Sequence, residues 1–412
     1  MGLGISVSVS EFVKAISEVL DLGAPELNNH HKKVAYISWR IAQEINLPEA
    51  ELQELILAAM LHDIGAFSLE DRLQALEFES GELIGQCASL GFRLLDGFEP
   101  LSKAAGLIRY HYLPYNTNRD VPLGSYIIHL ADRVSVLIDD QREIFDQVQE
   151  IMETIRTSQD PFHPVALEAF EHLSGREYFW LETCSIEINS ALLSKLRFSE
   201  EQLDIVTLTS FAKLICHLID FRSRFTATHS SGVAAVATEL TRIIGYDEDQ
   251  CQLVLISGYL HDLGKIAVPN NLLEKPAALD VAEYNTVKKH AYYSYLILSN
   301  IQGMEEIAAW GAYHHERGNG NGYPFGKKGE DLGRLSQIMA CADIFTATAE
   351  DRPYRTGMDK DQISTILTNT ANEGGIDKEI IDNAIKEFDR LNAVRIDAQA
   401  KAHEEYEAFY QL

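Results

Sequence analysis

Seven residues in the second half of the chain have side chains that bind metal ions: His229, His261, Asp262, His290, His314, His315 and Asp343. Imidazoles and carboxylates without a thiolate suit iron or manganese, with nickel or zinc as alternatives. They are more ligands than one tetrahedral ion needs, so we expect two divalent ions bridged by the carboxylate of Asp262 at about 3.5–4 Å. Such a pair lowers the pKa of a shared water and directs the hydroxide at an electrophile such as phosphorus.

The elements that must position these ligands are expected to be helices, with the ligands at helix ends. Hydrophobic residues recur with a helical period almost throughout; Val233, Val236, Ala237, Leu240 and Ile244 form one such stripe. Long alternating strand patterns are absent from the sequence. The pattern therefore predicts an all-α protein.

The chain also repeats itself. Residues 29–65 align with residues 228–264 without a gap, and both segments end in His-Asp-x-Gly. Further on, YHYLPYN resembles HHERGNG, and HLADRVSVL resembles ACADIFTAT. A tandem duplication of one helical unit is therefore expected, with residues 1–195 as one domain and residues 196–412 as the other.

Composition limits the classes of partner. The 412-residue chain carries a net charge of −27, which disfavours nucleic acid polymers and anionic membranes. A small phosphorylated substrate remains compatible if metals and local basic residues reverse the sign at the site. Five widely spaced cysteines without a CxxC pair argue against disulfides and thiolate zinc sites and favour the cytoplasm. No apolar run reaches eighteen residues, so no membrane span is expected.

The second copy resembles the HD-GYP domain, a subgroup of the HD phosphohydrolase superfamily. The motifs FTATHSSGV, YLHDLGKIAVPNNLLEKP, EYNTVKKH, HHERGNGNGYP, ACADIFTA and DRPYR follow in order over most of residues 222–360. The resemblance implies a cytosolic bacterial phosphodiesterase. Such an enzyme opens a cyclic dinucleotide, typically cyclic di-GMP, to pGpG, to GMP or to both, with a metal-activated hydroxide.

The resemblance implies two overlapping ligand sets. The first metal takes His229, His261, Asp262 and Asp343. The second takes Asp262, His290, His314 and His315. Beside the bridging Asp262, the other implied catalytic residue is Lys265, which would also bind substrate by stabilising charge on the phosphate. The remaining implied substrate contacts are Arg352, Gly322, Tyr323 and Pro324.

Several positions depart from the family pattern, among them the residue after Pro276, where the usual glycine is missing. Asn319 replaces the aspartate of HHExxDGxGYP, and Thr346 replaces the second aspartate of DxxDA. Neither is a metal ligand in that pattern, so altered tuning or specificity is expected before loss of activity, with Asn319 as the first position to test for substrate choice. Phe225 stands where members with a third metal carry a glutamate, which favours two metals.

The first copy keeps the minimal ligand set of the superfamily: His30, His62, Asp63 and Asp132. His111 matches His315, but Ala66 replaces the lysine, Cys87 falls near the position of His290, and Tyr110 replaces the first histidine of the pair. We therefore expect a degenerate HD domain with a structural, dimerising or regulatory role. A single metal at the four ligands is the open alternative. The adjacent His31 is expected at the surface.

Two alternative functions stay open at this point. The substrate could be cyclic GMP-AMP, because no residue reads out the bases. The fold could also serve as a cyclic dinucleotide receptor or scaffold without turnover, although the complete ligand series with Lys265 argues against it. A diguanylate cyclase, another signalling protein or a second copy of the chain are further partners that the resemblance suggests.

Overall fold

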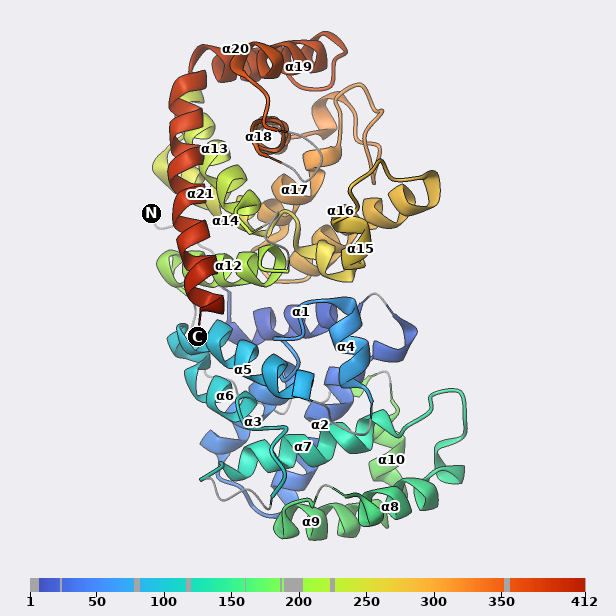
Figure 1. The fold of residues 1–412 in the computed structure, drawn as a ribbon. Helices are drawn as coiled ribbons and strands as arrows, with labels where there is room; N and C mark the ends of the chain where they lie inside the picture. The colour runs from blue at the N-terminus through green and yellow to red at the C-terminus, as the bar shows by residue number, and fades with distance from the viewer. Residues whose placement is uncertain are drawn as a thin grey trace. The chain divides into compact units, whose positions relative to one another are not determined.

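The structure is a computed structural model that describes residues 7–411, apart from residues 23, 78–81, 116–119, 160, 186, 189–202, 223–226 and 352–355. Its regular elements are α-helices and short 3₁₀ helices, so the all-α prediction is confirmed for the described chain (Figure 1). The chain divides into two compact units, Ser8–Glu201 and Gln202–Leu412 with Met1–Val7. The predicted boundary after residue 195 lies outside the described residues and stays a prediction.

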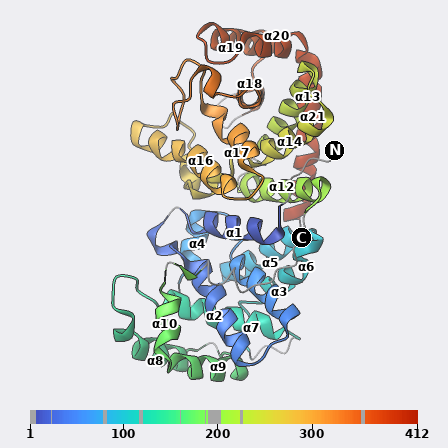
Figure 2. The same cartoon turned by 180° about the vertical axis from the view of Figure 1, so that it is seen from behind.

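The first unit contains the copy with the reduced ligand set. Its described α-helices are α1 (Val9–Leu20), α2 (His30–Glu44), α3 (Glu49–Met60), α4 (Leu69–Ala75), α5 (Glu82–Asp96), α6 (Ser102–Ile108), α7 (Leu123–Val136), α8 (Val148–Thr157), α9 (Pro164–Ser174) and α10 (Glu177–Thr183). Within it, α2 packs against α3 and α7 (Figure 2).

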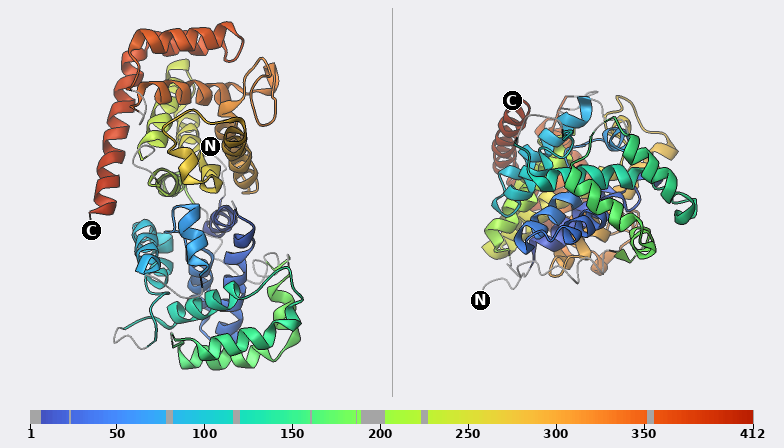
Figure 3. Two further views of the ribbon diagram at one scale, coloured as in Figure 1. Left: turned by 45° about the vertical axis from the view of Figure 1, so that its right-hand side comes forward. Right: turned by 90° about the horizontal axis from the view of Figure 1, so that it is seen from below.

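The second unit contains the full ligand set. Its described helices are α12 (Ile205–Asp220), α13 (His229–Ile244), α14 (Glu248–Leu260), η4 (Leu263–Ala267), α15 (Asn270–Leu273), α16 (Val281–Ser299), α17 (Glu305–Ala312), η5 (Tyr313–His315), η6 (Gly329–Asp331), α18 (Arg334–Ala349), α19 (Lys360–Asn372), α20 (Lys378–Lys386) and α21 (Phe388–Tyr410). The long α21 lies along α13, and α19 packs with α20 at one end of the unit (Figures 1 and 3). No helix in the described residues combines the length and apolar character needed to cross a bilayer.

The core of the second unit forms around α13 and α18. Val233, Val236, Ala237 and Leu240 on the predicted stripe of α13 are fully buried, and they pack with residues of α18 such as Phe345. Burying one such aliphatic or aromatic side chain stabilises the fold by about 1.5–3 kcal/mol. This core holds α13 and α18 in fixed register, so the ligands that they carry are fixed as well.

The ligands lie at helix ends less uniformly than the sequence suggested. His229 begins α13, His261 follows the last residue of α14, and His314 lies in the short η5. In contrast, His290 lies inside α16 and Asp343 inside α18, so the expectation that all seven stand at helix ends was wrong. An imidazole or carboxylate reaches a shared centre from a helix flank as well as from an end.

Candidate metal centre

The second unit brings all seven predicted ligands together. Their donor atoms form three overlapping groups, each within 4.8 Å: His229, His261 and Asp343; His261, Asp262 and His314; His290, His314 and His315. Five of the seven side chains are buried, whereas His315 and Asp343 are partly exposed. The centre is thus enclosed mostly by buried side chains, with partial exposure at His315 and Asp343.

Three of the histidines are oriented by the same kind of hydrogen bond. In His261, His290 and His314, Nδ1 donates a hydrogen bond to the backbone carbonyl three residues earlier, at 2.7, 2.6 and 2.7 Å. A carbonyl oxygen can only accept, so Nδ1 carries the proton and the neutral ring has its lone pair on Nε2. Fixing one ring nitrogen in this way orients the other as a metal ligand.

Asp262 lies between the ligand groups. One carboxylate oxygen is 3.1 Å from Nε2 of His261, and the other is 3.2 Å from Nε2 of His290 and 3.9 Å from Nε2 of His314. Nε2 of His261, Nε2 of His290 and Oδ1 of Asp262 are buried without a hydrogen-bond partner. Buried polar atoms are otherwise almost always satisfied, so these three fit a bound cation. The residues present therefore suit a pair of ions bridged by Asp262.

Burial and neighbouring charges favour the protonation states in which several of these ligands can bind a metal. Burial lowers the pKa of His290 and His315, and burial with the nearby His261 lowers that of His314 to about 3. Burial opposes ionisation of Asp262, but the neighbouring His261 and Lys265 outweigh it and hold the carboxyl pKa well below its usual value. Neutral imidazoles and an ionised carboxylate bind a metal without first losing a proton.

Lys265 lies at this centre as predicted. It stands in η4 three residues after Asp262, and its ammonium contacts the Asp262 carboxylate while remaining 22% exposed. Its position makes it the nearest described cation to the bridging group. Arg222, which the motif reading did not single out, holds η4 in place by donating to the carbonyls of Lys265 and Val268.

The glycine-rich loop is held by a buried glutamate. The Glu316 carboxylate is fully buried and accepts the backbone N–H groups of Phe325, Gly326 and Lys327 at 2.6, 3.2 and 2.9 Å. Position 322 requires a glycine because the backbone of Arg317 packs against it, and a Cβ there would lie 2.4 Å from the backbone nitrogen of Arg317. Glu316 lies within the HHERGNGNGYP motif, but its role in holding the loop was not predicted from the sequence.

The predicted substrate contacts are placed unevenly. Tyr323 stacks on His315 with ring centroids 4.7 Å apart, and Pro324 follows it through a cis peptide bond at an exposed position. Asn319 donates to the carbonyl of Glu373 at 2.8 Å and accepts the N–H of Asn321, so its amide organises the loop. Arg352 and Phe225 lie outside the described residues, so their predicted roles stay predictions.

The first unit also gathers its four retained ligands. Nε2 of His30 is 3.3 Å from Nε2 of His62 and 3.3 Å from Asp132, and Nε2 of His62 is 3.3 Å from Asp63. Protein groups bind one oxygen of each carboxylate, whereas Oδ1 of Asp132 is buried without a hydrogen-bond partner among the described residues. The buried Arg133 binds Asp132 at 2.6 Å.

Further groups complete this first-unit cluster. The Tyr112 hydroxyl donates to Asp63 at 2.7 Å. Gly65 approaches Cys87 so closely that a Cβ on the glycine would lie 2.0 Å from the Cys87 carbonyl, and Gly264 has the same relation, at 2.1 Å, to His290. Cys87 therefore does occupy the position that matches His290. His31 is fully buried and bonded to Asp21 at 2.6 Å, so its expected surface position was wrong.

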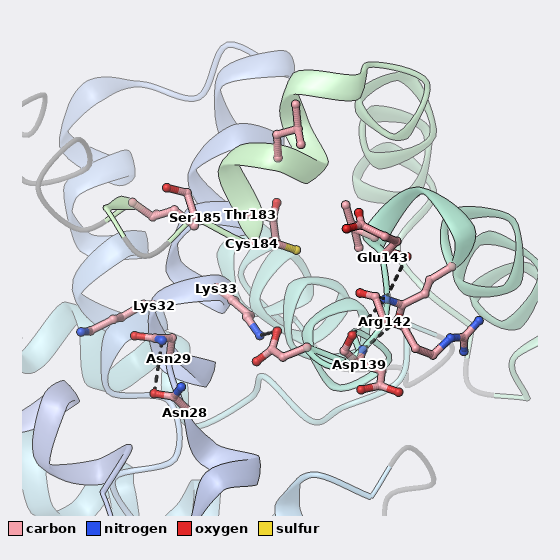
Figure 4. A pocket seen from close by; sticks show the side chains of 15 residues that line it. Asn28, Asn29, Lys32, Lys33, Asp139, Arg142, Glu143, Thr183, Cys184 and Ser185 are labelled. Atoms are coloured by element: carbon pink, nitrogen blue, oxygen red, sulfur yellow. Dashed lines mark hydrogen bonds and ion pairs between the residues drawn. The ribbon is translucent and has the colours of Figure 1, made fainter.

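A separate cavity of about 470 Å³ lies in the first unit, between residues that follow α7 and the segment around α10 (Figure 4). Its basic side chains are already paired. Lys33 binds Asp140 at 2.6 Å, Arg142 binds Glu150 at 3.2 Å, and Lys32 lies 3.7 Å from Glu18. The cavity therefore offers little uncompensated positive charge for a phosphate.

Two family models match the chain. Both are described as the HD domain, one over residues 213–380 and the other over residues 28–137, together more than half of the chain. The chain belongs to the HD domain family. The tandem arrangement expected from the internal repeat is thereby confirmed, with one HD domain matching each unit.

Several known proteins resemble this HD protein. The 3′3′-cGAMP-specific phosphodiesterase 1 of Vibrio cholerae is 28% identical over 92% of both chains. The cyclic di-GMP phosphodiesterase response regulator RpfG of Xanthomonas campestris is 32% identical, over 42% of this chain and 44% of its own length. A crystal structure described as a cyclic GMP-AMP specific phosphodiesterase of V. cholerae matches 94% of this chain and 98% of its own, with a TM-score of 0.66 and 23% identity. This last likeness shows a shared fold.

Proposed function

We propose that the protein is a metal-dependent phosphodiesterase that hydrolyses a cyclic dinucleotide. The observation that carries the proposal is the placement of Asp262 between two groups of imidazoles, with three buried donor atoms that have no hydrogen-bond partner in the described part of the chain. The two relatives compared by sequence above are named as phosphodiesterases of cyclic dinucleotides. Iron or manganese are the proposed ions, with nickel or zinc as alternatives, because the donors are nitrogen and oxygen without sulfur.

The chain's own groups then have defined tasks. His229, His261, Asp262 and Asp343 would hold one ion, and Asp262, His290, His314 and His315 the other. When bound, the ion pair supplies a hydroxide nucleophile and neutralises the phosphate. Lys265 places its ammonium beside the same carboxylate, where it would stabilise charge that develops on the phosphate oxygens. Tyr323 lies on the ring of His315, so the substrate would meet an aromatic surface at the exposed side of the centre.

Two cyclic dinucleotides are candidate substrates, and the relatives named for them match different shares of the chain. Cyclic di-GMP is the substrate that the motifs put first. The relative that matches nearly the whole chain is named for 3′3′-cGAMP, whereas the cyclic di-GMP relative matches less than half of it. The full-length match favours 3′3′-cyclic GMP-AMP, with cyclic di-GMP as the alternative.

The experiment compares both substrates on the full chain purified with its native metals. Hydrolysis is followed by chromatography for the wild type, for Asp262→Ala, and for Asp63→Ala, the matching change in the first unit. We expect turnover that Asp262→Ala abolishes and Asp63→Ala retains. Binding of either substrate with full metal occupancy but no turnover would replace the enzyme with a receptor.

For residues 1–195 we propose a structural or regulatory domain, and for residues 196–412 the catalytic domain. Support comes from Arg133 and Tyr112, which engage the oxygens of Asp132 and Asp63 from within the protein. The guanidinium bound to one oxygen of Asp132 offsets part of the negative charge there. His30, His62 and Asp63 still form a ligand group, and Oδ1 of Asp132 has no hydrogen-bond partner within the described residues, so a single bound metal is the alternative for this unit. Loss of catalysis in Asp63→Ala with an intact fold would contradict this division of labour.

A further inference from the structure

The ring of His229 is oriented by a different kind of hydrogen-bond partner from the rings of His261, His290 and His314. His261, His290 and His314 use a backbone carbonyl, but Nδ1 of His229 faces the carboxylate of Glu350 at 3.1 and 3.2 Å. Glu350 is 8% exposed and follows the last residue of α18. An ionised carboxylate can only accept, so it places the proton on Nδ1 and leaves Nε2 for a metal. Nε2 of His229 is 3.4 Å from Asp343 in the first ligand group.

Glu350 is in turn held by the C-terminal helix. The side-chain amide of Gln399 on α21 donates to the Glu350 carboxylate, and Arg395 donates to the amide oxygen of Gln399 at 2.6 Å. Gly232 on α13 leaves room for this contact, because a Cβ there would lie 2.8 Å from Nε2 of Gln399. Side chains from α21 and α18 thus converge behind the ring of His229.

The internal repeat offers a comparison within the same chain. In the first unit, Nδ1 of His30 faces the hydroxyl of Ser135 at 3.2 Å, three residues after Asp132. The matching residue in the second unit is Thr346, three residues after Asp343, and its hydroxyl is buried without a hydrogen-bond partner. The partner of the histidine therefore lies one helical turn further along, at Glu350, where four residues make about one turn.

We propose that Glu350 is a positioning residue for His229, anchored by Gln399, and that it supplies the carboxylate that position 346 does not. This proposal rests on the proposed metal-dependent function. A carboxylate behind a ligating imidazole fixes its tautomer and raises its basicity, and loss of such a partner weakens metal affinity by about 10–100-fold. The C-terminal helix α21 thereby contributes to the first metal site without touching the metal.

The test measures metal affinity directly, by chelator-buffered Mn²⁺ titration and by the metal content of the full chain. Glu350→Gln keeps the shape but loses the charge, so we expect one of the two ions to bind about 10–100-fold more weakly. Gln399→Ala should weaken the same ion by less. Adding Thr346→Asp to Glu350→Gln should restore affinity, an effect that a purely structural role would not give. The exposed Glu306→Gln is the matched control and should leave both affinities unchanged.

Unchanged Mn²⁺ affinity in Glu350→Gln would overturn the proposal, as would a wild-type chain that binds no metal. If Glu350→Gln does not fold, the milder Gln399→Ala decides by the same titration, and wild-type affinity there would also overturn it. Weakened affinity in a protein that hydrolyses neither cyclic dinucleotide would support Glu350 while refuting the proposed function.

Discussion

Gly264 offers the sharpest test of how the centre is built. The residue lies two positions after Asp262, and its backbone packs against the carbonyl of His290 on α16. A Cβ at Gly264 would lie 2.1 Å from that carbonyl oxygen, whereas ordinary contact begins near 3.4 Å. Gly264→Ala must therefore move η4 and α16 apart by about 1.3 Å. The displacement lies between the segments that carry Asp262 and His290, which are proposed to share one ion.

Two consequences of this displacement have different magnitudes. Overpacking of this kind costs about 1–3 kcal/mol of stability. A misplacement of about 1 Å at a reacting centre costs on the order of 100-fold in rate. We therefore expect the Gly264→Ala protein to fold, with a lowered Tm, and assays are run below that Tm. We also expect it to lose one of two bound ions and to hydrolyse substrate at least about 100-fold more slowly.

The repeat supplies the matched control. Gly65 stands in the same place in the first unit, where a Cβ would lie 2.0 Å from the carbonyl of Cys87. Gly65→Ala should lower Tm by a similar amount but leave metal content and turnover unchanged. Tm is measured by calorimetry, metal by elemental analysis, and turnover by chromatography. Full metal content and wild-type turnover in Gly264→Ala would refute the reasoning.

Four further predictions follow from single contacts. Lys265→Met should keep both metals and reduce kcat by about 100–1000-fold, because it removes one donor to the phosphate; a steady-state assay with an unchanged kcat would remove Lys265 from the mechanism. Asn319→Asp loses the amide donor that ties the loop to the chain near residue 373, so it should cost about 1 kcal/mol in urea unfolding and leave substrate preference unchanged. A switch in preference would instead make Asn319 a specificity residue. Arg133→Met leaves Asp132 buried without its cation and should destabilise the first unit by about 3–5 kcal/mol, and a loss below about 1 kcal/mol would contradict that pairing. Burial and neighbouring charge lower the pKa of His314 to about 3 in the metal-free folded chain, from 6.5 in the unfolded chain. Between pH 6.5 and pH 3 the unfolded chain therefore binds more protons at this residue, so the free energy of unfolding should fall as pH drops from 6.5 towards 3. His314→Gln should flatten that part of the urea-unfolding profile, and an identical profile in both proteins would contradict the assignment.

Most of the centre could be predicted from the sequence because its ligands lie in a repeated pattern. The spacing of His229 and His261 matches that of His30 and His62, which singles these residues out from other histidines. The structure brings all seven predicted ligands within reach of one another. Types and order of residues were sufficient here because few side chains bind a transition metal.

The residues behind the ligands could not be predicted in this way. Glu350 meets His229 across 121 positions of sequence, and Gln399 reaches it from another helix. His31 was expected at the surface because it adjoins a ligand, yet it is buried against Asp21. The hydrogen bond that the Asn319 amide donates to the carbonyl of Glu373 was not predicted either, and the expectation that Asn319 affects substrate choice stays a prediction. A hydrogen-bond partner is defined by direction and distance, which linear spacing does not contain.

By itself, the sequence determined the helical fold, the duplication, the residues proposed as ligands and which of those residue types the first copy lacks. These follow from hydrophobic period and from residue chemistry, which are local properties. Only the tertiary structure decided which nitrogen of each histidine faces the centre, what compensates the carboxylates of the first unit, and how α21 reaches His229. These depend on helices packing at fixed angles and distances, because a buried charge or lone pair is satisfied only by the atom that packing places beside it.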